Sequence, residues 1–124
     1  MKIMFSAGEA SGDLHGANLA RSLKELDPSV ELLGMGGREM AAAGVDIVYD
    51  LKNLGVIGVG EILRKIPFFF RLRDFLVNKM KEEKPDVLVC IDYPGFNMKM
   101  ARWAKEHGIR TFYYIAPKVW AWRE

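Results

Sequence analysis

The chain has 124 residues and 50% of them are apolar, which suits one folded domain and excludes a disordered segment. Eighteen Lys and Arg oppose sixteen Asp and Glu, and a formal charge of +2 is too small to indicate nucleic-acid binding. The single cysteine, Cys90, excludes an internal disulfide framework and a cysteine-based metal site, which is typical of a reducing compartment.

Short apolar runs alternate with helical patterns along the chain. The patterns predict strands at 2–7, 30–35, 45–49, 86–92 and 110–116, and helices at 14–26, 38–43, 67–83 and 95–107. Pro67 fits a first helical turn, Pro85 ends that helix, and Gly108 is typical of a helix C-terminus. The alternation predicts an α/β fold with a parallel sheet and helices on both faces.

The turn after the first strand reads "SAGEASGDLHG" and is rich in glycine, serine and acids. Ligands of parallel sheets sit beyond the carboxyl ends of the strands, so this turn is a candidate sugar-binding site. Its candidate contacts are Gly8, Glu9, Ser11, Gly12 and Asp13. The turn lacks the lysine of a phosphate-binding loop and the dinucleotide glycine spacing, and its acids would repel a pyrophosphate but accept bonds from sugar hydroxyls. The alternative is that Ser11 or Asp13 simply caps the helix.

A second candidate site is "CIDYPGFN", at the end of the most strand-like run in the chain. Asp92 there would face the same crevice as the first turn and could act as a general base, or it could cap the helix that follows. Asn97 could orient a ligand hydroxyl or be an ordinary first-turn polar residue. His15, beside Gly16, could reach the crevice, but the preferred interpretation is a surface residue.

The stretch "EILRKIPFFFRLRDFLVNKMKEEK" is more apolar than one sheet-facing helix stripe needs, and cations flank its apolar residues. It could lie on an anionic membrane surface or form two core helices with solvated basic faces. The candidate membrane contacts are Ile62, Leu63, Ile66, Phe69 and Phe70. We find no leader peptide and no apolar run of the roughly 18 residues that span a bilayer, so we expect a cytoplasmic protein.

Several segments together resemble the amino-terminal part of the lipid A disaccharide synthase family, which are bacterial glycosyltransferases. The segments are "SAGEASGDLHG", "GMGGREM", "LGVIGVGEIL", "PDVLVCIDYPGFN" and "YYIAPKVWAWR", in that order over nearly the whole chain. The resemblance implies a Rossmann-like domain, residues 1–124, as the acceptor-side and incomplete amino-terminal half of a GT-B glycosyltransferase. The UDP-binding second domain would be absent, and this chain alone would be inactive.

The resemblance also implies the reaction. The family joins UDP-2,3-diacylglucosamine to 2,3-diacylglucosamine 1-phosphate (lipid X) through a β-1,6 bond, with inversion and release of UDP, in lipid A and lipopolysaccharide biosynthesis. Asp92 aligns with the family's proposed base, the first turn would line the sugar cleft, and residues 59–72 would dock on the inner leaflet of the inner membrane. Neither a metal nor another cofactor is implied. Ala116 departs from a serine expected in many relatives.

Two other functions remain open at this point. A UDP-sugar epimerase of similar fold would use the same cleft without a lipid, and a non-catalytic Rossmann-like binding module would need no base at Asp92.

Overall fold

The computed structural model describes residues 1–8, 10–51, 66–91 and 94–114. The elements in chain order are β1 (Lys2–Ala7), α1 (Ala10–Leu26), β2 (Glu31–Gly36), α2 (Arg38–Ala42), β3 (Asp46–Asp50), α4 (Ile66–Glu83), β4 (Val87–Ile91), α5 (Pro94–Glu106) and β5 (Arg110–Tyr114). The glycine-spaced stretch "LGVIGVGEIL" and the segment "VWAW" lie outside the described residues.

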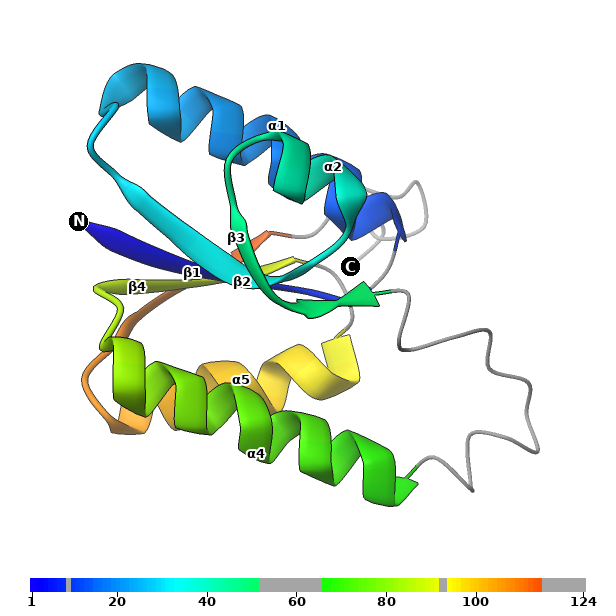
Figure 1. Ribbon diagram of the computed structural model, residues 1–124. Coiled ribbons are helices and arrows are strands. Elements are labelled where there is room, and N and C mark those ends of the chain that lie inside the picture. Colours follow the sequence, from blue (N-terminus) through cyan, green and yellow to red (C-terminus); the bar gives the residue numbers. More distant parts are fainter. Residues whose placement is uncertain (9, 52–65, 92–93, 115–124) are drawn as a thin grey trace, which may run out of the picture.

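The five strands form one parallel sheet in the order β3-β2-β1-β4-β5. Helices α1 and α2 lie on one face of the sheet and α4 and α5 on the other (Figure 1). The α/β, Rossmann-like arrangement with helices on both faces is therefore confirmed. β1 stands at the centre, and the chain moves outward from it in one direction through β2 and in the other through β4.

Each face of the sheet carries its own apolar core, because neighbouring residues of a strand point to opposite faces. On the α1 side the buried core includes Ile3, Phe5, Ala7, Ala17, Ala20, Leu32, Met40, Val87, Val89 and Ile91. On the α4 side it includes Met4, Leu33, Met35, Leu72, Leu76, Met80, Leu88, Cys90, Met100 and Ala104. All five residues of β4 are buried, as its continuous apolar run predicts.

Most predicted elements agree with the observed ones to within a residue or two. Pro67 lies in the first turn of α4, Pro85 follows the end of that helix, and Gly108 adopts φ 77° after α5, as predicted. The main difference is α1, which begins at Ala10 and not at Leu14. Ser11, Gly12 and Asp13 therefore belong to the helix and not to the turn that precedes it.

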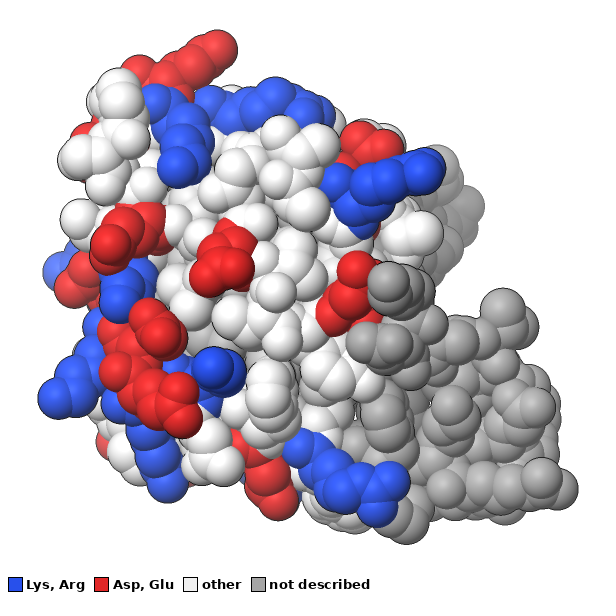
Figure 2. Space-filling view, in the orientation of Figure 1, with Lys and Arg blue, Asp and Glu red and all other residues white. Residues whose placement is uncertain are grey.

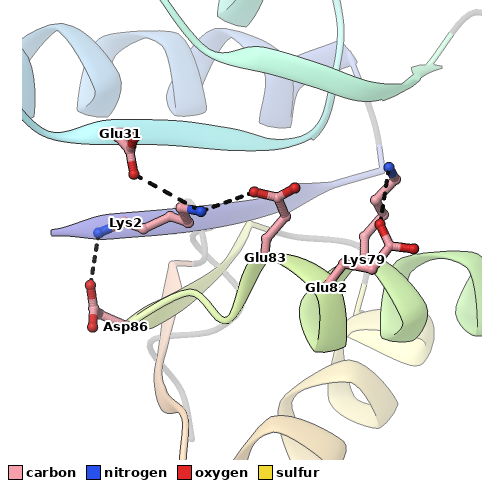
Figure 3. A network of polar contacts seen from close by, with 6 residues as sticks. All are labelled: Lys2, Glu31, Lys79, Glu82, Glu83 and Asp86. Carbon is pink, nitrogen blue, oxygen red and sulfur yellow. Dashed lines mark hydrogen bonds and ion pairs between the residues drawn. The ribbon is translucent and has the colours of Figure 1, made fainter.

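Two further features fix the position of β1 in the sheet: its close approach to β2, and hydrogen bonds at the amino-terminal edge. Gly34 in β2 has φ 151°, and a side chain there would collide with the backbone of Phe5 in β1. At the amino-terminal edge of the sheet, Lys2 donates to Glu83 at 3.0 Å, and its backbone N–H donates to Asp86 at 2.8 Å (Figure 3). These bonds connect β1 to the end of α4 and the start of β4. This edge is opposite to the one at which ligands of such sheets bind.

Candidate functional site

The candidate site lies at the carboxyl edge of the sheet, where β1 and β4 end side by side. Ala7 pairs with Ile91 as the last residue of each strand. The strand order reverses between these two strands, and in open parallel sheets this is the position at which ligands bind. Gly8 follows β1 here and is half-buried. Glu9 and Asp92, predicted as contact and base, lie outside the described residues.

Gly12 brings the first turn of α1 against the ends of both strands. A Cβ atom at Gly12 would lie 3.4 Å from Ala7 Cβ and from Ile91 Cγ2, so the helix backbone here packs directly against the ends of both strands. Ser11, one residue earlier, is exposed. The amino-terminal end of a 17-residue helix therefore lies beside the carboxyl ends of β1 and β4, with the N–H groups of its first turn, which have no acceptor within the helix, at that edge.

Asp13 caps a helix, but a different one from the helix expected. Its side chain is 7% exposed and accepts backbone N–H bonds from Gly37 at 2.8 Å, Glu39 at 3.0 Å and Met40 at 3.0 Å. These N–H groups belong to the amino-terminal turn of α2. Gly37 is the N-cap residue of that helix and has no side chain that could cap it. Both carboxylate oxygens of Asp13 are therefore used in connecting α1 to α2.

Asn97 is fully buried and connects β1, β4 and α5. Its Nδ2 donates to the backbone oxygen of Ser6 at 2.9 Å and to that of Ile91 at 3.3 Å. The hydroxyl of Ser6 donates to Asn97 Oδ1 at 2.6 Å. The amide group thus links the ends of β1 and β4 at the carboxyl edge of the sheet. Ser6 was not among the predicted site residues, although a lone serine within an apolar strand was a usable signal.

His15 and Tyr114 meet on the α1 side of the same edge. Their ring centroids are 5.5 Å apart, with the rings inclined by 45°. His15 is half-buried and Tyr114, at the end of β5, is 43% exposed. Their contact lies at the carboxyl edge of the sheet, where β5 ends. Trp120 and Trp122, in the motif "YYIAPKVWAWR", lie outside the described residues.

Cys90, in contrast, has no chemical role that its environment supports. Burial raises the pKa of its thiol to about 12, so the sulfur stays protonated and weakly nucleophilic at neutral pH. The sequence-based interpretation of Cys90 as a small core residue agrees with its position in the α4-side core.

Of the predicted membrane contacts, Phe70 is the one whose side chain the structure describes. Ile62 and Leu63 lie outside the described residues, while Ile66 and Phe69 belong to α4 with side chains that are not described. Phe70 is 45% exposed, and two cations lie near its ring, Arg73 at 5.1 Å and Lys99 of α5 at 5.3 Å. An exposed aromatic ring beside two cations is compatible with an anionic surface.

Comparison with known proteins decides the family. Residues 3–124 match the family described as lipid-A-disaccharide synthetase. The chain belongs to the lipid-A-disaccharide synthetase family. This confirms the resemblance drawn from the sequence motifs.

The relatives of this chain are considerably longer than it is. The lipid-A-disaccharide synthases of Coxiella burnetii (strain Dugway 5J108-111) and Geobacter sulfurreducens are each 47% identical to it and match 98% of its length. That of Hydrogenovibrio crunogenus is 48% identical over 95% of the chain. The chain spans 32% of the length of the first two relatives and 31% of the third.

The described residues contain neither a candidate metal site nor a candidate membrane span. Its described histidines, cysteines and acids form no group of three that could hold a metal ion. No described helix combines the length and apolarity needed to cross a membrane. On the face shown in Figure 2, basic and acidic side chains are interspersed over the described residues, without a broad region of one sign. That face offers no extended basic track of the kind that binds nucleic acid.

Proposed function

We propose that this chain is the amino-terminal, acceptor-side domain of a two-domain GT-B glycosyltransferase. The complete protein would join UDP-2,3-diacylglucosamine to lipid X through a β-1,6 bond and release UDP. The observation that carries this proposal is the family match over residues 3–124, because it covers every element that surrounds the crevice. The UDP-binding domain would come from the two thirds of the relatives' length that this chain does not span.

The base of this reaction would be Asp92. Inversion requires that the 6-hydroxyl oxygen of lipid X attack the anomeric carbon while the bond to UDP breaks and UDP leaves with the electron pair. The hydroxyl proton must pass to a base, and a carboxylate near the crevice can accept it. Asp92 directly follows Ile91, whose side chain and backbone lie beside Gly12 and the start of α1. This sequence position supports the assignment.

The acceptor sugar would bind at the amino-terminal end of α1. Gly8, Glu9, Ser11 and Gly12 are the proposed contacts, because backbone N–H groups and small side chains let a polyhydroxylated ligand approach closely. Asp13 and Asn97 would act as positioning residues, since their polar atoms already bond to α2 and to the strand ends. Asp13 fixes α1 against α2, and Asn97 sets the spacing of β1 and β4.

The acyl chains would be delivered at the cytoplasmic face of the inner membrane. Ile62, Leu63, Ile66, Phe69 and Phe70 are the proposed contacts with the lipid. Exposure of Phe70 beside Arg73 and Lys99 supports this, because an aromatic ring can enter the headgroup layer while the cations meet anionic phosphates. Substrates with several acyl chains would then reach the crevice without full transfer to water.

The test compares the two aspartates at the two ends of β4 in the two-domain protein. Asp86 immediately precedes the strand and Asp92 immediately follows it. UDP release is measured after mixing UDP-2,3-diacylglucosamine with lipid X. We expect Asp92→Asn to lower kcat by about 100-fold or more, which is the usual contribution of a general base. Asp86→Asn should keep the parent rate, since its partner, the N–H of Lys2, can still donate to an amide oxygen.

Each contrary outcome has a definite meaning. An active Asp92→Asn enzyme would return Asp92 to the role of a helix cap. A folded two-domain protein that releases no UDP from these substrates would overturn the substrate assignment and favour an epimerase or a binding module. Residues 1–124 alone should release none, because the donor-binding domain is absent.

A further inference from the structure

The buried polar side chains of the described residues all lie at the carboxyl edge of the sheet. They are Ser6, Asp13 and Asn97. Asp13 serves as the cap of α2, whereas Ser6 of β1 and Asn97 of α5 bond to each other. Asn97 already has a positioning role in the proposed reaction, and Ser6 has none. Because a buried hydroxyl costs free energy unless it is hydrogen-bonded, a serine inside an apolar strand calls for an explanation.

Ser6 holds the amide group of Asn97 in one orientation. Its hydroxyl donates to Asn97 Oδ1 at 2.6 Å, and its backbone oxygen accepts from Nδ2 at 2.9 Å. A flipped amide would place Oδ1 against that backbone oxygen, and two oxygens of this kind cannot bond to each other. Nδ2 is thereby also directed to the backbone oxygen of Ile91, at 3.3 Å. Ser6 therefore acts on the end of β4 through Asn97.

The two backbone oxygens that Asn97 binds belong to peptide bonds that lead into the crevice. The oxygen of Ile91 is part of the peptide unit that Ile91 shares with Asp92, the proposed base. The oxygen of Ser6 lies two residues before Gly8, a proposed contact of the acceptor sugar. Since a peptide unit is planar, a bond to its oxygen also restrains the atoms on its nitrogen side. The orientation of one buried amide is thus coupled to the chain on both sides of the crevice.

Attachment of α5 to the sheet does not by itself require this polar pair. The helix packs on the α4-side face (Figure 1) through Met100 and Ala104, which are both fully buried. Replacing both partners of a buried hydrogen bond by apolar groups of the same shape is often nearly neutral for stability. What the polar pair adds to the packing is a fixed direction for two backbone oxygens.

We propose that Ser6 is a positioning residue of the transfer reaction, which keeps the Asn97 amide turned toward Ile91 and so holds the base in place. This inference rests on the proposed function and on Asp92 as its base. Ser6 is fully buried and out of reach of the substrates, so its loss should lower kcat and leave KM nearly unchanged. A misplacement of about 1 Å can cost about 100-fold in rate. We expect about tenfold for Ser6→Ala, because both bonds of Nδ2 can still form.

The test is a double-mutant cycle in the two-domain protein, with UDP release from UDP-2,3-diacylglucosamine and lipid X as the assay. In the parent, Ser6→Ala should lower kcat about tenfold and change KM for either substrate by less than about twofold. In the slow Asp92→Asn background, Ser6→Ala should change the residual rate by less than about twofold, since no base is left to position. A general loosening of the fold would lower the rate by the same factor in both backgrounds.

Cys90→Ala is the matched control. Cys90 of β4 pairs with Ser6, is fully buried, and donates weakly to the backbone oxygen of Asn97 and not to its amide. It should lose stability, as urea midpoints would show, but keep the parent kcat. If Ser6→Ala does not fold, Ser6→Cys takes its place, because a thiol has nearly the shape of the hydroxyl but donates only weakly.

The possible results separate the role of Ser6 from the proposed function. Parent kcat in Ser6→Ala, with Asp92→Asn slow, would overturn the role of Ser6 alone. An equal loss in Cys90→Ala, or the same loss in both backgrounds, would overturn it in favour of a purely structural serine. A folded parent that releases no UDP, or a fully active Asp92→Asn protein, would remove the reaction or the base on which the role depends.

Discussion

Replacing Asp13 by alanine should strongly destabilise the fold, because the carboxylate is the cap of a helix to which it does not belong. Three backbone N–H groups of the α2 turn, from Gly37, Glu39 and Met40, donate to it at 2.8–3.0 Å. Hydrogen bonds to charged groups contribute about 1.5–3 kcal/mol each, whereas the loss of a whole cap residue costs about 0.5–2 kcal/mol. Since Asp13 is 7% exposed, water replaces the lost bonds poorly, and we expect a loss of about 2–4 kcal/mol.

Asparagine at this position separates the geometry from the charge. Oδ1 of Asp13 accepts from Gly37 and Met40, and Oδ2 accepts from Glu39. An amide can keep the first two bonds, but its NH₂ would face the N–H of Glu39. We therefore expect Asp13→Asn to lose about half as much stability as Asp13→Ala, roughly 1–2 kcal/mol.

The free energy of unfolding, from urea titrations followed by far-UV circular dichroism, measures both effects. Asp27→Ala is the matched control, because Asp27 accepts two bonds from Ser29 but is exposed at the end of α1. It should cost clearly less than Asp13→Ala, because water replaces the lost bonds of an exposed carboxylate. If Asp13→Ala were no less stable than Asp27→Ala, the carboxylate would not hold α2, and a direct role in ligand binding would become the better explanation of Asp13.

Two further predictions concern α4, the first its exposed Phe70 and the second the ion pair at its carboxyl end. Phe70→Ser should weaken binding of the chain to vesicles that contain anionic phospholipid by about tenfold, since insertion of a half-exposed Phe gains about 1.5 kcal/mol. Co-sedimentation with the vesicles measures this, with Phe75→Ser as the control. An equal fall in both variants would show that insertion is not specific to Phe70. The bond between Lys2 and Glu83 raises the pKa of Lys2 above 10.5 and lowers that of Glu83 below 4.5. Its stabilisation should therefore be complete between about pH 4.5 and 10.5, and be lost as the pH falls through the folded-state pKa of Glu83 or rises through that of Lys2. Urea midpoints of the parent chain should decline on the acid side more steeply than those of Glu83→Gln, and parallel curves would contradict this assignment.

The fold could be predicted from the sequence where the signals are local. Strand alternation, the proline positions of α4 and the glycine after α5 depend on residues within one element, and they placed most elements correctly. The start of α1 could not be predicted in this way, because glycine disfavours helix interiors. Gly12 is nevertheless helical, and it packs against Ala7 and Ile91, which are contacts from elsewhere in the fold.

The candidate site could likewise be predicted only where its signals are local. Its position at the first turn followed from the general rule for parallel sheets, and the motifs identified the family. The roles of Asp13 and Asn97 depend on partners 24–27 and 91 residues away in the sequence, such as Gly37 and Ser6, which no local pattern indicates. A polar residue in a turn can bond to a ligand or to a distant backbone group, and the fold alone determines which.

The central position of β1 has a consequence for the order of events during synthesis. β1 is made first, yet its neighbour β4 begins 84 residues later, as the pairing of Ile3 with Val87 shows. At ordinary rates of translation this interval is about 4–17 s. During that time one edge of the central strand β1 has no partner, and the core residues of β4 and α5 are still missing from both faces of the sheet. Such late, long-range pairing slows folding and exposes strand edges to other nascent chains. The nascent protein would therefore depend most on chaperones in the interval before residue 91 leaves the ribosome.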